Sequence, residues 1–280
     1  MGSVSRIRRG WALTGKSWAL LRSHPALMRF PLLGTVAMIP VAVVPIAGLY
    51  LLDTHRYGAG VPVLAVGLYL LVFIGIYFGV GLAAAADATF HGREATFGDG
   101  MRAARGRLGA IAGWALVSAV VGTAFGALES AGQGLADIVG GLLNAAWGLI
   151  TFLAVPVIAI EGTGPIETLK RSASLFKERW AGQVTGNVAI GGIVGLLGVL
   201  PAILLILVGG WLWLGDGNGT ELALGAVLVA IGVVVFAISA LILRALRGVF
   251  GVALYRFALD GEAVAGFEAA ELESAVSPRR

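Results

Sequence analysis

GPIETLKRSASLFKERW, residues Gly164 to Trp180, is the longest charged interruption in a chain that is otherwise almost entirely apolar. Pro165 suits the first position of a helix, and Glu167 in the first turn favours the positive end of the helix dipole. Apolar residues recur here at spacings of three and four, which is the period of one stripe along an α-helix. The stripe consists of Ile166, Leu169, Ala173, Phe176 and Trp180. We therefore expect an amphipathic helix over 165–180, lying on the cytoplasmic surface of a membrane.

The composition of the whole chain places it in a bilayer. Of its 280 residues, 58% are hydrophobic and only 13% are charged, and the mean hydropathy is +0.90. A soluble core of this length does not need so much apolar surface. The absence of cysteine excludes disulfides and thiolate chemistry. The 43 glycines are typical of closely packed transmembrane helices.

Apolar runs of about 20 residues match the hydrocarbon core of a bilayer, which is about 30 Å thick. We expect six such spans, over residues 30–52, 61–86, 108–128, 138–160, 186–214 and 222–243. The predicted fold class is all-α: a polytopic bundle of three helical hairpins, each preceded by a cytoplasmic amphipathic helix. The transmembrane domain then covers 30–259, between a basic cytoplasmic interfacial helix at 1–29 and a polar tail at 260–280.

The distribution of Lys and Arg sets the orientation of these spans. If both termini are cytoplasmic, every basic residue except Arg56 lies on the cytoplasmic side or at that interface. An odd number of spans would place Arg244, Arg247 and Arg256 on the outer side. We therefore expect a multi-pass protein with both termini in the cytoplasm.

The basic helices carry the candidate contacts to the membrane. Lys and Arg beside an apolar stripe attract anionic lipid headgroups. The candidate headgroup contacts are Arg8, Arg9, Lys16, Lys170, Lys177 and Arg179. The candidate membrane-facing anchors are Trp11, Trp18, Phe176 and Trp180.

Glu161 stands where the fourth span meets the helix at 165–180. One interpretation is a structural pair with Arg171, or with Lys170, that fixes this helix against the membrane. The other is an interfacial carboxylate that faces solvent, because exposed pairs add little stability.

Several stretches resemble a domain-of-unknown-function family of prokaryotic polytopic membrane proteins. They are KSWALLRSHPALMRFPLL at 16–33, FHGREATFGDGMRAARGRLGAIAGWAL at 90–116, VPVIAIEGTGPIETLKRSASLFKERW at 155–180 and ALYRFALDGE at 253–262. A more distant likeness is to the membrane domain found beside glycerophosphodiester phosphodiesterases, although the phosphodiesterase barrel is missing. The resemblance implies a prokaryotic plasma (inner) membrane and a six-span fold, and it implies no activity.

Two motifs have a formal match to ligand sites. GWALTGKS at Gly10–Ser17 fits the GxxxxGK[ST] phosphate loop, but no strand precedes it, so we interpret it as amphipathic helix and expect no nucleotide. Asp87, His91 and Glu94 fall at i, i+4 and i+7, a spacing that can place metal ligands on one helical face. A single histidine is a weak pattern, and we interpret these residues as a solvated helix end with no metal.

The charge pattern gives two hypotheses for function. The first is a non-enzymatic envelope scaffold or accessory factor that contacts anionic lipid, a protein partner or a second copy of itself. The alternative is a transporter or channel for a lipid or other apolar solute, since kinked, glycine-rich spans can move without buried charge. A continuous polar or lipid-sized cavity open to one leaflet favours transport, and a tightly packed bundle favours the scaffold. We expect no cofactor, no nucleic-acid partner and no set of convergent catalytic groups.

Overall fold

The computed structural model describes residues 18–19, 21–131, 147–148, 151–180, 198–214, 219–261 and 264. Within these ranges the regular elements are all helices. Contacts divide the chain into two compact units. We call His24–Gly182 with Gly248–Ala265 the large unit, and Met1–Ser23, Gln183–Arg247 and Gly266–Arg280 the small unit.

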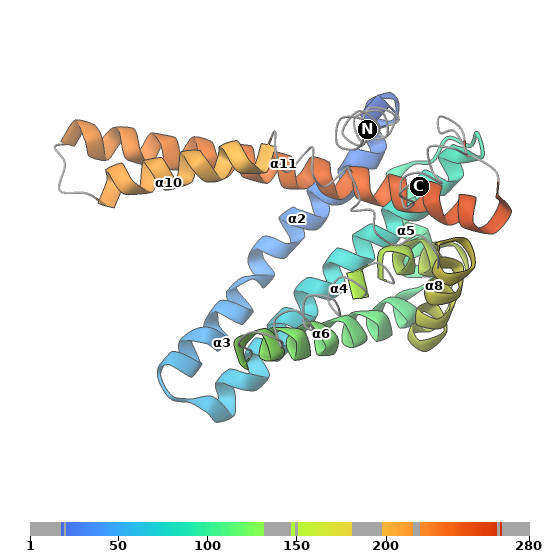
Figure 1. Ribbon diagram of the computed structural model, residues 1–280, viewed down its shortest axis with the longest axis horizontal. Helices are drawn as coiled ribbons and strands as arrows, with labels where there is room; N and C mark the ends of the chain where they lie inside the picture. Colours follow the sequence, from blue (N-terminus) through green and yellow to red (C-terminus); the bar gives the residue numbers. More distant parts are fainter. Residues whose placement is uncertain are drawn as a thin grey trace. The chain divides into compact units, whose positions relative to one another are not determined.

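The first predicted span is a broken helix that begins the large unit (Figure 1). After a short 3₁₀ turn, η1 (Pro25–Met28), it consists of α2 (Arg29–Val41) and α3 (Val43–Asp53). The break falls at Ala42. Pro45 has no N–H, so it cannot donate a hydrogen bond to the carbonyl of Val41, the residue just before the break. The kink predicted from the prolines therefore has a direct cause in the backbone.

The chain then reverses at Thr54–Arg56 and returns as α4 (Tyr57–Phe90), which runs beside α2 and α3 (Figure 1). Glycines allow the two backbones to touch. A Cβ atom at Gly48 would lie 2.5 Å from the backbone nitrogen of Leu64, and one at Gly67 would lie 2.5 Å from the nitrogen of Pro45. Such close approach is how transmembrane helices gain packing energy where lipid supplies no hydrophobic drive.

The small unit contains a second antiparallel helix pair built in the same way. α10 (Leu200–Leu214) packs against the first part of α11 (Gly219–Asp260). A Cβ at Gly209 would lie 2.7 Å from the carbonyl oxygen of Gly225, and one at Gly232 would lie 2.9 Å from that of Ala202. The many glycines of this chain thus act at helix contacts in both units.

The remaining described helices complete the large unit. They are α5 (Phe97–Arg105), α6 (Leu108–Ala131), a helix over Thr151–Ile160 and α8 (Pro165–Trp180). The bounds of α8 are those that the sequence predicts. Its axis turns by 116° from the helix before it.

Within the described residues, four helices are long and apolar enough to cross a membrane: Pro25–Asp53, Tyr57–Phe90, Leu108–Gly126 and Gly219–Asp260. A fifth results if the bent pair Thr151–Ile160 and Pro165–Leu175 is one span. The predicted spans at 138–160 and 186–214 lie partly outside the described residues. The structure therefore supports a helical membrane protein, and six spans in three hairpins stay a prediction.

The sixth predicted span, 222–243, lies within α11, which continues unbroken to Asp260 and has 42 residues. At 1.5 Å per residue this helix is about 63 Å long, twice the thickness of the hydrocarbon core. Arg244 and Arg247 suggest the end of a span, but Arg, Leu and Ala are strong helix formers, and nothing in the sequence stops the helix there.

The core of the large unit lies at the ends of the helices that the charge pattern predicts to be cytoplasmic, which we call the inner ends. The last turns of α4 and α11 are buried there with α6 and Thr151–Ile160. The largest buried side chains from these helices are Leu82, Ile111, Trp114, Leu153, Ile158, Phe250 and Tyr255. In contrast, Val43, Ile46, Leu49 and Tyr50 of α3 are more than half exposed, as residues that face lipid would be.

The glycine contacts of the first hairpin give a direct test. We expect Gly67→Ala to lower the free energy of unfolding by about 1–3 kcal/mol, because the new Cβ overlaps the backbone of Pro45 and forces the helices apart. Gly58→Ala is the matched control on α4, since no atom lies within 4 Å of its Cβ position. Thermal unfolding of both variants in detergent measures the difference. Equal melting temperatures would contradict the packing described here.

Candidate functional site

Polar side chains from several helices meet at the inner end of the large unit, which we call the inner cluster. Its most buried contact joins α4 to α11. Arg256 donates from Nε to Oδ1 of Asp87 at 2.6 Å and from Nη2 to Oδ2 at 2.8 Å. Only 20% of the arginine side chain and 12% of the aspartate side chain are exposed. A bidentate pair of this kind fixes both the position and the orientation of the two helices.

Glu161 lies at the bend between Thr151–Ile160 and α8, and it receives two hydrogen bonds on Oε1. Arg171 donates from Nε at 2.9 Å, and the hydroxyl of Tyr255 donates at 2.7 Å. The structure thus brings together Glu161 and Arg171, the two members of the candidate structural pair. It adds Tyr255 of α11 as a third member that links α8 to the same helix as Arg256.

Arg107, in the turn between α5 and α6, closes the end of the helix at Thr151–Ile160. It donates from Nη1 to the carbonyl of Ile158 at 2.7 Å and from Nη2 to that of Ile160 at 3.2 Å. The last carbonyls of a helix have no partner in the helix itself, and a cation there also suits the dipole. Burial lowers the pKa of Arg107 below its usual value, although a guanidinium with so high a pKa remains charged.

The chain can turn at this point because of Gly162. Its φ of +73° lies in the left-handed region, and a Cβ there would lie 2.5 Å from Nη1 of Arg107. Glycine is therefore required twice, once for the backbone and once for the space that the arginine occupies.

The hydrogen bonds of the inner cluster join several helices of the large unit to one another. Both oxygens of Asp87 and Oε1 of Glu161 accept hydrogen bonds from guanidinium or phenol groups. The side chain of Asp87 is 12% exposed and that of Glu161 is 24% exposed. In the part of the chain that the structure describes, three or more His, Asp or Glu residues do not gather in one place.

Asp87, His91 and Glu94, the possible metal pattern, do not converge on one site. α4 ends at Phe90, so Glu94 lies in the following loop and does not continue the helical face. The carboxylate of Asp87 binds Arg256, and Nδ1 of His91 lies 2.7 Å from the backbone oxygen of Asp87. The spacing i, i+4, i+7 is therefore not realised as one face.

The buried face of α8 differs from the face that carries the apolar stripe. The buried residues are Thr168, Ser172 and Leu175, roughly a third of a turn from the stripe, whereas Ile166 is 68% exposed. Thr168 is satisfied locally, with its hydroxyl 2.8 Å from that of Thr163. The side chains of Phe176 and Trp180 lie outside the described residues, so their contact with the membrane stays a prediction.

The candidate lipid contacts are only partly described. Lys170 and Lys177 are exposed on α8, and Trp18 is 42% exposed. The other candidates lie outside the described residues: Arg8, Arg9, Trp11, Lys16 and the side chain of Arg179. The GxxxxGKS segment at Gly10–Ser17 lies outside them as well.

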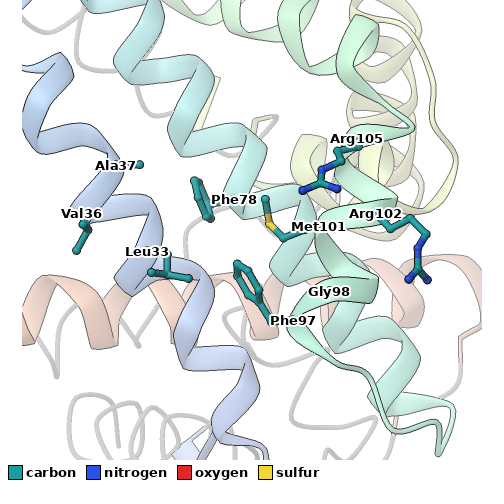
Figure 2. A pocket seen from close by; sticks show the side chains of 9 residues that line it. All are labelled: Leu33, Val36, Ala37, Phe78, Phe97, Gly98, Met101, Arg102 and Arg105. Carbon is teal, nitrogen blue, oxygen red and sulfur yellow. The ribbon is translucent and has the colours of Figure 1, made fainter.

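A groove of about 620 Å³ opens beside the inner cluster, between α2, α4 and α5 (Figure 2). Most of its lining is apolar, and two arginines of α5 stand at one side. The lining residues are Leu33, Val36, Ala37, Phe78, Phe97, Gly98, Met101, Arg102 and Arg105. None of these residues is among the candidate site residues predicted from the sequence.

α5 is held in place at the edge of this groove by its first turn and by an aromatic contact. Thr96 and Asp99 form a capping box, in which each side chain accepts from the other residue's backbone N–H. Hydrogen bonds from the hydroxyl and the backbone N–H of Thr96 hold the pKa of Asp99 below its usual value. The rings of Phe97 and Phe30 lie 4.7 Å apart and anchor α5 to α2.

Sequence reasoning missed Arg107, Tyr255 and Arg256, the three donors that hold the inner cluster together with Arg171. Arg256 interrupts the apolar run ALYRFAL, and Asp87 follows the run AAAA. A charge inside an apolar helix needs a buried partner. That rule would have marked both residues, although it does not identify which charge pairs with which.

The Asp87–Arg256 pair gives a second prediction. We expect Arg256→Met to lower the free energy of unfolding by about 3 kcal/mol, because a buried carboxylate is left without its partner. The double variant Asp87→Asn/Arg256→Met should recover much of this loss, since it removes the uncompensated charge. Chemical or thermal unfolding in detergent compares the two. A double variant that is less stable than the single one would contradict this role.

Gly162 gives a third prediction. Gly162→Ala should cost about 1–3 kcal/mol, because alanine is strained at a positive φ and its Cβ displaces Arg107 from the carbonyls it caps. Gly164→Ala, two residues away, is the control, as its Cβ would meet no atom within 4 Å. Protease sensitivity of the 161–164 bend should rise only in the Gly162 variant. A Gly162 variant as resistant as the control would show that the bend does not depend on this glycine.

Comparison with known proteins places this architecture in one family. The model of a family of unknown function, DUF6159, matches residues 59–267, which begin in α4 and end after α11. No curated protein and no solved structure matches the chain. The matches therefore do not support the more distant likeness to the membrane domain of glycerophosphodiester phosphodiesterases. Because the matched range covers most of the chain and includes the whole inner cluster, the protein belongs to the DUF6159 family.

Proposed function

We propose that this protein is a non-enzymatic scaffold or accessory factor of the prokaryotic plasma membrane, with both termini in the cytoplasm, that holds anionic lipid or a partner against basic cytoplasmic helices. Two described helices supply the basic surface. Arg102 and Arg105 lie on α5, and Lys170 and Lys177 on α8, all of them exposed. Both helices adjoin apolar helices long enough to cross a bilayer.

The observation that carries this proposal is the difference between two groups of cations. Arg107, Arg171 and Arg256 bind carboxylates or carbonyls within the large unit. Lys170 and Lys177 have exposed ammonium-bearing side chains on a helix whose Ile166 is also exposed. An exposed apolar residue beside exposed cations is the pattern that binds an anionic membrane surface.

The alternative function, transport of a lipid or other apolar solute, is favoured by one observation. The groove between α2, α4 and α5 has a volume within the range of about 300–1,000 Å³ that small-molecule sites show. A groove of this size can take an acyl chain, which is the ground on which transport stays the alternative. Reconstituted vesicles that carry a fluorescent lipid separate the two functions: lipid exchange between leaflets above the protein-free rate supports transport, and its absence supports the scaffold.

A fourth prediction concerns α8. In vesicles of phosphatidylglycerol and phosphatidylcholine, we expect the protein to enrich phosphatidylglycerol around itself, and Lys170→Gln/Lys177→Gln to reduce the enrichment several-fold. Each Lys near the surface contributes about 1 kcal/mol to attraction of anionic lipid. Extraction of the protein with its surrounding lipid, followed by lipid quantification, measures this.

The matched control is Lys170→Arg/Lys177→Arg, which keeps both charges and should keep the enrichment. Raising the ionic strength should weaken it, since surface electrostatics are screened over about 10 Å at 0.1 M salt. Enrichment that is equal in the Gln and Arg variants would remove the support for α8 as a lipid contact.

A further inference from the structure

We propose that the groove between α2, α4 and α5 is a specific site for one anionic phospholipid of the cytoplasmic leaflet, with its phosphate at Arg105 and an acyl chain along α2 and α4. This inference rests on the proposed function and deepens it. The proposed function needs only basic surfaces that attract lipid in general. A built site would retain one molecule in a fixed position.

The depth of the groove in the membrane follows from the lengths of α2, α3 and α4. The turn at Thr54–Arg56 joins α3 to α4, and the predicted topology puts it on the far side of the bilayer from the inner cluster. About 20 helical residues cross the hydrocarbon core. Counted from that turn, they reach Leu33 on α2 and Phe78 on α4. Both residues line the groove, so the groove lies at the level where headgroups meet acyl chains.

The lining has the polarity that a phospholipid requires at this level. On α2, Leu33, Val36 and Ala37 provide aliphatic surface, and Phe78 and Phe97 add aromatic surface. Leu33 and Val36 are 40% and 52% exposed, so this wall faces outward and is open to the bilayer. An acyl chain of the bound phospholipid would lie against this wall in place of the bulk lipid that otherwise covers it.

The charge lies on the opposite wall, at the end of α5. Figure 2 shows the Arg105 side chain extending back toward Met101 and Phe78, while Arg102 points away from α2. Arg102 donates to Oδ1 of Asp99 at 2.9 Å. Arg105 forms no ion pair or side-chain hydrogen bond with any residue that the structure describes. Its planar guanidinium matches the geometry of a phosphate group, to which arginine binds with two parallel hydrogen bonds.

These features select a phospholipid with a net negative charge. Arg102 and Arg105 outnumber Asp99 on α5, so a lipid phosphate meets a positive field there. A phosphatidylcholine headgroup would bring its own ammonium close to these arginines, whereas phosphatidylglycerol brings none. The site should therefore prefer phosphatidylglycerol, because both lipids offer the same acyl chains.

The test uses native mass spectrometry of the full chain in detergent, titrated with phosphatidylglycerol or with phosphatidylcholine of the same acyl chains. We expect one phosphatidylglycerol molecule to bind per chain well before any further lipid binds, and phosphatidylcholine to bind more weakly. Arg105→Gln should weaken the phosphatidylglycerol adduct by about tenfold or more, the value of a charged hydrogen bond. Arg93→Gln, which removes an exposed arginine from the loop before α5, should leave it unchanged.

Gly98→Leu tests the apolar wall without unfolding the protein. A Cβ at Gly98 meets only the hydroxyl oxygen of Thr96, at an ordinary 3.6 Å, and leucine favours the helix more than glycine does. The larger side chain should fill the groove and abolish the adducts of both lipids, while the melting temperature is retained. The proposal is wrong if Gly98→Leu or Arg105→Gln binds phosphatidylglycerol as tightly as the unaltered chain, or if the two lipids bind equally.

The same titration separates this inference from the proposed function. Lys170→Gln/Lys177→Gln should keep the single tight adduct and lose only the general enrichment in vesicles. A chain that shows lysine-dependent enrichment without the tight adduct would refute the groove site and leave the proposed function standing. A tight adduct without lysine-dependent enrichment would do the opposite.

Discussion

The contact on which the large unit depends is the bidentate ion pair between Asp87 and Arg256. It joins residues that are 169 positions apart and closes the unit by fixing the last turns of α11 against the last turn of α4. Once α11 is fixed, Tyr255 reaches Glu161, and Glu161 in turn holds Arg171 of α8. The pair can be buried because the attraction between the two charges and their two hydrogen bonds offset the cost of removing both charges from water.

The position of this pair follows from the lengths of the two helices that carry it. α4 has 34 residues and α11 has 42, and both exceed the roughly 20 that a bilayer needs. A helix of either length that crosses the bilayer once has turns beyond the hydrocarbon, where water is present and the hydrophobic effect operates. That difference explains why Trp114, Phe250 and Tyr255 are fully buried at the inner ends, while α3 packs through glycine and exposes its large side chains. One chain thus uses two packing mechanisms, and each appears where its solvent favours it.

Local signals in the sequence identified the elements, and long-range contacts decided what they do. Pro165 and Glu167 define the start of α8 without any knowledge of its neighbours, and Pro45 causes the break at Ala42. The inward face of α8 was not predictable in this way, because Thr168 and Ser172 are polar and become buried only when α8 packs within the large unit. The helical continuation of α11 past Arg244 and Arg247 has no local signal for a similar reason, because the partners that bury most of residues 249–258 come from distant parts of the chain. The groove has no sequence signal of its own, since its apolar lining cannot be told from other lipid-facing residues.

The arginines of the inner cluster and the described lysines have different contacts, and side-chain chemistry explains the difference. The cations of the inner cluster, Arg107, Arg171 and Arg256, are all arginines, whose planar guanidinium can bind two acceptors at once. Both described lysines, Lys170 and Lys177, are exposed. An ammonium group is a strongly hydrated point charge, so it gains little from burial and retains its attraction for a charged surface. The rule that positive residues mark the cytoplasmic side counts the two kinds equally. In this protein the arginines of the inner cluster stabilise the fold, so fewer cations are available for the proposed contact with lipid than the 20 basic residues suggest.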